Sequence, residues 1–125
     1  MKSGEVALAR SRFEVDEAAR KVADLERTIR DLEGKAADLD RQLRAEENQA
    51  RIKDPTHFAY SSFAHSALRR DKLLSSVADL NAKLGVATRV HAEALEKFQQ
   101  LSNFAERKSS SYKAGIGDES NGDKL

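Results

Sequence analysis

Apolar residues recur along two long stretches of the chain at alternating steps of three and four residues. This seven-residue period places them on one stripe of a helix and is typical of helices that pair in a coiled coil. In the first stretch only Ser11 interrupts the stripe, whose other members are Leu8, Val15, Ala18, Val22, Leu25, Ile29, Leu32, Ala36, Leu39 and Leu43. The second stripe consists of Phe63, Ser66, Arg70, Leu73, Val77, Leu80, Leu84, Ala87, His91, Ala94, Phe98, Leu101 and Ala105. The pattern predicts two long amphipathic helices.

The only proline of the chain, Pro55, lies between the two stretches. A proline disfavours helical geometry in the residue before it, and it fits the first turn of a new helix. Asp54 can cap that helix by accepting from its free amides. We therefore expect a helix over residues 4–51, a turn over 52–55 and a second helix over 56–108.

The residues after Lys108 have a different composition. A run of serines at 109–111 is followed by a polar segment rich in glycine at 115–123. Such a segment cannot bury enough apolar surface to offset the entropy of ordering. The sequence thus predicts a disordered tail over residues 109–125.

The two stripes also predict how the helices pair. Residues that face each other across an antiparallel seam have numbers with a constant sum, and Leu8 with Leu101, Ile29 with Leu80, and other layers all give 109. Half of 109 falls between Asp54 and Pro55, which is the turn that the proline predicts independently. The fold class expected is all-α, a long two-helix antiparallel coiled-coil hairpin over residues 1–108. An extended parallel dimer is the alternative, although Pro55 would break its continuous helix.

Composition and charge agree with a thin apolar seam and exclude several functions. The chain of 125 residues is 39% apolar and 34% charged, has a mean hydropathy of −0.67 and contains no Trp, so a thick core is not expected. Its 22 basic and 21 acidic residues nearly cancel, which argues against nucleic acid as a partner. No apolar run approaches the ~20 residues needed to span a bilayer, and no signal peptide is recognised.

Catalytic and metal-binding patterns are not found in the sequence. There is no glycine-rich phosphate loop, no nucleophile elbow and no Cys, so we expect no enzyme, no cofactor and no small-molecule substrate. Asp54 and His57 could touch a metal, but capping and turn formation explain them better, and no metal is predicted. His91 is expected in the seam, opposite Ala18, either as a polar layer that fixes the register or as a titratable switch.

A basic cluster and several aromatic residues are the candidate partner-binding sites. Arg69, Arg70 and Lys72 form a basic patch or an ordinary solvated face, and the stem of Arg70 is expected to lie along the seam opposite Leu39.

Phe58 and Tyr60 fall off the seam close to the turn, where they bind a partner or form a small cluster with Ile52 and Phe63. Phe13 and Phe104 fall off the seam at the opposite end of the expected hairpin.

Three segments resemble a known family. Residues 38–47 (DLDRQLRAEE), 54–60 (DPTHFAY) and 69–74 (RRDKLL) are similar to the alphaproteobacterial branch of the flagellar export protein FliJ family, with the turn motif carrying most of the resemblance. The resemblance implies a soluble stalk or adaptor of the flagellar type III protein export apparatus. The alternative is a structural coiled-coil spacer or dimeric scaffold without an export role.

The resemblance also implies partners and a location. They are the hexameric flagellar export ATPase, the cytoplasmic linker of the export-gate membrane protein, and export chaperones. Such a protein would be cytoplasmic and would associate peripherally with the cytoplasmic face of the inner membrane through the export apparatus. The candidate residues Phe58, Tyr60 and Phe13 come from exposure reasoning and not from the family.

Overall fold

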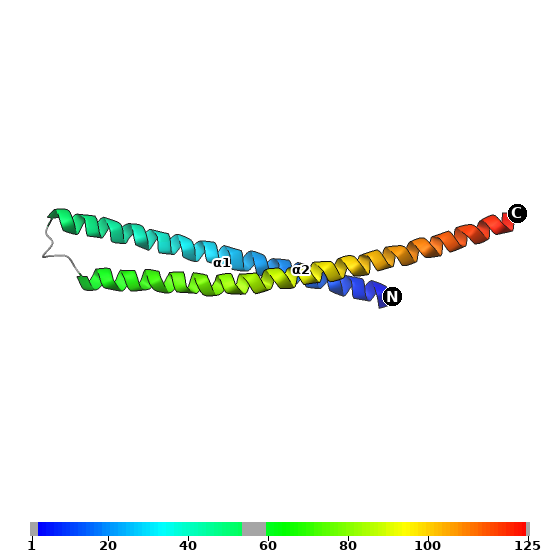
Figure 1. Cartoon of the computed structure of the whole chain (residues 1–125), viewed down its shortest axis with the longest axis horizontal. Coiled ribbons are helices and arrows are strands. Elements are labelled where there is room, and N and C mark those ends of the chain that lie inside the picture. The colour runs from blue at the N-terminus through cyan, green and yellow to red at the C-terminus, as the bar shows by residue number, and fades with distance from the viewer. Residues whose placement is uncertain (1–2, 54–59, 125) are drawn as a thin grey trace. The chain divides into compact units, whose positions relative to one another are not determined.

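The computed structural model describes the backbone of residues 3–53 and 60–124, and the side chains of residues 3–49 and 63–108. The described chain is entirely helical and consists of α1 (Ser3–Lys53) and α2 (Tyr60–Lys124), shown in Figure 1. The helices divide between two compact units, Lys21–Ala87 and the combination of Met1–Arg20 with Thr88–Leu125. Within each unit a segment of α1 packs against a segment of α2 that runs in the opposite direction. This confirms the predicted fold class of two paired antiparallel helices.

The helix bounds differ from the predicted ones near the proline. α1 continues to Lys53, two residues past the predicted end, because the proline restricts Asp54 and leaves Lys53 free to remain helical. The described part of α2 begins at Tyr60, and residues 56–59, where the sequence predicts the start of the second helix, lie outside the described residues. The predicted cap at Asp54 and the turn at Pro55 lie outside the described residues and stay predictions.

The C-terminal end of α2 also differs from the prediction. α2 extends to Lys124, through the segment 109–124 for which the sequence predicts a disordered tail, and not to Lys108. No proline follows Pro55 in the sequence, so no residue in this segment sterically ends the helix. The side chains of residues 109–125 lie outside the described part of the chain.

The predicted seam is confirmed residue by residue. Every member of the first stripe is buried or partly buried, and Ser11, Ile29, Ala36 and Leu43 are the most buried. Every member of the second stripe is also buried or partly buried, except Ala105. The register places Ala105 opposite Gly4, which has no side chain to cover it. Ala105 is the one stripe member within the described residues that is exposed, and it lies at the end of the stripe.

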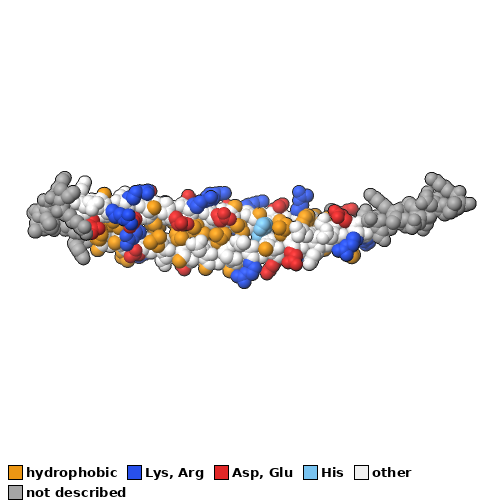
Figure 2. Space-filling model, turned by 45° about the horizontal axis from the view of Figure 1, so that its top comes forward, with side chains coloured by type: hydrophobic (Ala, Val, Ile, Leu, Met, Phe, Trp, Pro, Cys, Tyr) orange, Lys and Arg blue, Asp and Glu red, His pale blue; other side chains and the backbone are white. Residues whose placement is uncertain are grey.

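In the Lys21–Ala87 unit, the buried hydrophobic residues come from both helices. They are Ile29, Ala36, Leu43, Val77 and Ala87, each 8% exposed or less. Because small alanines alternate with larger side chains, the two backbones can approach closely while the space between them is filled. Figure 2 shows hydrophobic side chains gathered lengthwise along one face, with charged side chains projecting beside them.

In each unit one ion pair joins α1 to α2 and shows which residues of the two helices lie close together. Arg70 Nη1 lies 2.9 Å from Asp40 Oδ1 in the Lys21–Ala87 unit, and Lys97 Nζ lies 3.6 Å from Glu14 Oε2 in the other unit. The residue numbers of these pairs sum to 110 and 111, within two of the predicted 109. A long charged side chain can reach diagonally to a residue one or two positions away from the one directly opposite. Both pairs therefore agree with the register that the stripes predict.

Charged pairs along α1 lie on the surface away from α2. Glu17–Arg20, Asp24–Arg27 and Asp38–Arg41 each join an acid to an arginine three residues later, and all six side chains are largely exposed. Pairs of this kind contribute a few tenths of a kcal/mol to the helix. They make the outer surface of α1 polar without directing how the helices pair.

Ser11 is the most buried polar residue of the described chain. Its side chain is 2% exposed, and its Oγ has no hydrogen-bond partner among the described residues. A buried hydroxyl without a partner costs about 1–3 kcal/mol of desolvation. The seam of its unit therefore contains a destabilising polar layer, opposite Phe98 in the register.

We predict that Leu25→Ala lowers the free energy of unfolding by about 2 kcal/mol or more, because it removes apolar volume from the seam. Leu68→Ala is the matched control in the same unit, since Leu68 is 53% exposed. Circular dichroism with urea titration measures both changes. Equal losses in the two variants would contradict the seam as the source of stability.

We also predict that Ser11→Ala stabilises the protein by about 1 kcal/mol, because it removes the unpaired hydroxyl while keeping most of the volume. Ser75→Ala, at an exposed position of α2, controls for the higher helix propensity of alanine. Thermal melts compare the two. A gain at Ser11 no larger than that at Ser75 would show that the buried hydroxyl is satisfied in solution.

Candidate functional site

The described residues contain no cluster suited to a metal ion. No group of three or more His, Asp or Glu side chains converges anywhere in this part of the chain.

Neither helix contains, within its described residues, an apolar stretch long enough to cross a membrane.

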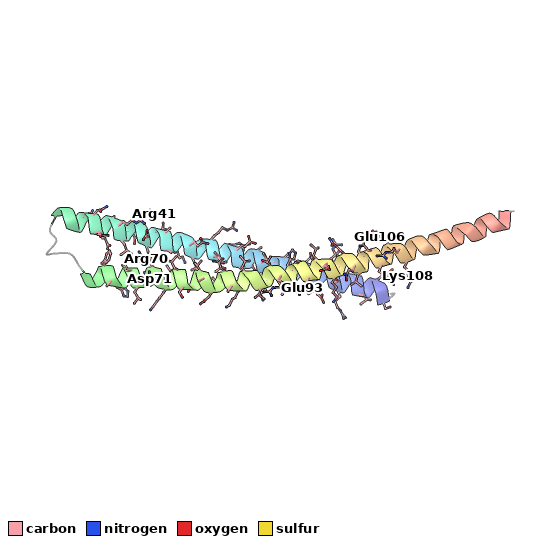
Figure 3. All side chains as sticks on the ribbon, in the orientation of Figure 1. Arg41, Arg70, Asp71, Glu93, Glu106 and Lys108 are labelled. Atoms are coloured by element: carbon pink, nitrogen blue, oxygen red, sulfur yellow. The ribbon has the colours of Figure 1, made fainter. Side chains whose placement is uncertain are left out.

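Three charged side chains gather around Arg70 at its seam position in the Lys21–Ala87 unit. Arg70 Nη1 donates to Asp40 Oδ1 at 2.9 Å, and Arg70 Nη2 and Nε donate to Asp71 Oδ1 at 3.2 and 3.3 Å. Asp40 Oδ2 in turn lies 3.0 Å from Arg44 Nη2. Figure 3 labels Arg70 and Asp71 on α2. We call Arg70, Asp40, Asp71 and Arg44 the Arg70 network.

The network forms because the seam register directs the side chain of Arg70 toward α1. The stem of Arg70 lies at the position opposite Leu39, and Asp40 is the next residue on α1, so the guanidinium meets a carboxylate at the edge of the seam. The hydrogen bond to Asp40, and then that to Asp71, raise the pKa of Arg70 above its ordinary value. The guanidinium is therefore held charged and oriented.

The basic cluster predicted as a binding patch is thus divided between two roles. Arg70 is only 29% exposed and is engaged with two carboxylates, so it joins the helices. Arg69 and Lys72 are exposed, and neither forms an ion pair within the described part of the chain. Binding of a partner by Arg69 and Lys72 stays a prediction.

The aromatic candidates fall into two sets. Phe13 and Phe104 are 64% and 65% exposed, which confirms that they lie off the seam. Phe58 lies outside the described residues, and the side chain of Tyr60, the first residue of α2, does too. A role for Phe58 and Tyr60 in binding or in a local cluster is therefore still a prediction.

The structure describes the side chains of two of the three histidines. His91 is partly buried in the second stripe, at the position that the register places opposite Ala18, and His65 is exposed. His57 lies outside the described residues. This position fits both a polar layer that fixes the register and a titratable switch, so both roles stay predictions.

Sequence reasoning missed the acids that pair across the helices, although a signal for them was present. Asp40 directly follows Leu39 in the first stripe, and Glu14 directly precedes Val15. Lys97 likewise directly precedes Phe98. Positions that flank a coiled-coil seam commonly hold opposite charges on facing helices. The constant sum of 109 alone would not have found these pairs, whose sums are 110 and 111, but a search of flanking acids for a basic residue within one or two positions of the facing one would have.

The fold and its ion pairs define a two-helix antiparallel coiled coil. No protein-family model matches the chain, and no curated protein or solved structure matches it either.

We predict that Asp40→Ala lowers the melting temperature more than Asp24→Ala does. Asp40 holds the half-buried Arg70, whereas Asp24 pairs at 3.6 Å with the exposed Arg27 on the same helix. Raising the salt concentration to about 1 M should shrink the difference, because salt screens the lost attraction. Equal melting temperatures for the two variants at low salt would show that the Arg70 network adds nothing to stability.

Proposed function

We propose that the protein is a coiled-coil adaptor that acts by binding other proteins, as a stalk-like component of the flagellar type III protein export apparatus. The observation that supports an adaptor is the pairing of two long helices around a narrow seam, which leaves most side chains outside it available to partners. The specific assignment is supported by the FliJ-like segments at 38–47, 54–60 and 69–74. No catalytic role is part of the proposal.

The adaptor would couple the hexameric export ATPase to the cytoplasmic linker of the membrane export gate, and would contact export chaperones. It would work in the cytoplasm, at the cytoplasmic face of the inner membrane. Exposed aromatic side chains support protein contacts, since large apolar groups in water are favourable anchors for a partner. Phe13 and Phe104 are such groups in the described chain.

The assignment is tested by adding the purified chain to the export ATPase of the same species. We expect co-purification and a faster rate of ATP hydrolysis than with the ATPase alone. A second coiled-coil protein of similar length and charge serves as the control for non-specific helix binding. If neither co-purification nor stimulation is observed, the assignment to export is wrong.

For the turn region we predict that Phe58→Ala combined with Tyr60→Ala weakens binding of the ATPase while the melting temperature changes little. The reason is that both aromatic residues fall off the seam register, so that a partner and not the hairpin would cover them. Leu68→Ala controls for removal of another apolar side chain from α2. A large fall in melting temperature would instead place both rings in a structural cluster.

The second candidate function is a structural spacer or dimeric scaffold, favoured by the heptad pattern itself, which also permits pairing between chains. Light scattering at low micromolar concentration separates the two architectures. A mass near 13.9 kDa fits a self-sufficient hairpin. Twice that mass at such low concentration would favour the scaffold.

A further inference from the structure

The seams of the two units differ in how completely they are buried. We call Lys21–Ala87 the central unit, and Met1–Arg20 with Thr88–Leu125 the terminal unit. All five hydrophobic side chains that are 8% exposed or less among the described residues belong to the central unit. Since burial of apolar surface is the main source of stability for paired helices, the terminal unit has the weaker seam.

The one buried side chain described in the terminal unit is polar. Ser11 is 2% exposed, and its Oγ has no hydrogen-bond partner among the described residues. The polar seam residue Arg70 of the central unit, by contrast, donates to Asp40 and Asp71. A buried hydroxyl without a partner regains hydrogen bonds to water when the helices around it separate. Ser11 therefore favours an open state of the terminal unit.

The ion pair that joins the helices of the terminal unit adds little resistance to their separation. Lys97 Nζ and Glu14 Oε2 lie 3.6 Å apart, and the two side chains are 61% and 44% exposed. Exposed pairs of this kind contribute little to stability. Arg70 and Asp40 of the central unit are closer, at 2.9 Å, and less exposed. Both the seam and the ion pair beside it are thus weaker in the terminal unit.

We propose that the terminal unit opens by itself, and that the unpaired hydroxyl of Ser11 promotes this opening. Residues 3–20 of α1 separate from residues 88–105 of α2 while the helices of the central unit stay paired. Proteins open locally in cooperative segments, and the segments with the least apolar burial open at the lowest free energy. The opening exposes seam side chains such as Val15 and Phe98, and it does not depend on the flagellar assignment.

Hydrogen exchange of the full chain, followed by mass spectrometry, measures the opening. A helix that loses its packing partner has little stability of its own, so its amides exchange with deuterium. Residues 3–20 and 88–105 should both show protection factors at least about tenfold lower than residues 25–43. Equal protection in all three segments, or a smooth decline toward Ser3 without a step between Ala18 and Leu25, overturns the proposal.

The variant Leu25→Ala distinguishes local opening from unfolding of the whole chain. It weakens the central seam, so exchange of residues 25–43 should accelerate at least about tenfold. Exchange of residues 3–20 and 88–105 should stay unchanged, because their opening does not involve the central seam. An equal acceleration in all three segments would mean that the helices separate only as a whole, and would refute the proposal.

Low concentrations of urea test the same point in the unmodified protein. A local opening exposes less surface than unfolding of the whole chain, so urea promotes it less steeply. Exchange of residues 3–20 and 88–105 should change little with urea, whereas that of residues 25–43 should accelerate steeply. Identical urea slopes for all three segments would contradict an independent opening.

The variant Ser11→Ala tests the role of the buried hydroxyl. It should slow exchange of residues 3–20 and 88–105 about fivefold more than Thr88→Ala does. Thr88→Ala is the matched control, because it removes an exposed hydroxyl from the same unit and also raises helix propensity. Equal slowing by the two variants would show that Ser11 does not promote the opening, and the proposal would then be wrong.

Discussion

In both units a single line of side chains from α1 meets a single line from α2, and nearly all burial in the described chain occurs there. The helices are long and highly charged, and a solvated helix of that composition receives little stabilisation from its own surface pairs. Packing at the seam is therefore what holds the helices together. The positions of the outer charges, of the Arg70 network and of the exposed Phe13 all follow from which residues lie inside the seam.

With an apolar seam alone, one helix could shift along the other by seven residues, because small and branched residues recur with the same period on both helices. The flanking charges remove that freedom. Asp40 meets Arg70, and Glu14 meets Lys97, only in a register close to that given by the turn. A slip of seven residues would separate Asp40 from Arg70 by about two turns of helix. The polar contacts thus contribute specificity even where their contribution to stability is small.

The seam could be predicted from the sequence almost completely, since heptad spacing is a property of one helix and the constant sum needs only residue numbers. The exceptions have local causes. Ala105, at the end of the stripe and opposite Gly4 in the register, is exposed. α1 extends past its predicted end because Pro55 restricts only Asp54. These effects depend on the residue opposite or adjacent, which a stripe pattern does not include.

The candidate site was less predictable for the same reason. Arg70 was identified as a seam residue with a charged head, but its engagement depends on Asp40, thirty residues away on the other helix. Exposure of Phe13 followed directly from its place off the stripe.

The thinness of the seam also determines how the protein responds to heat and denaturant. Unfolding exposes little apolar surface per residue, because few of the described apolar side chains are as buried as Ile29 and Val77, at 5% and 8% exposed. The heat capacity change and the denaturant slope both scale with that newly exposed area, so both should be small for a chain of this length. The stability curve is then flat and the melting transition broad. A small entropy of unfolding also makes the midpoint temperature sensitive, so a substitution of modest free energy moves it further than in a globular domain of equal size.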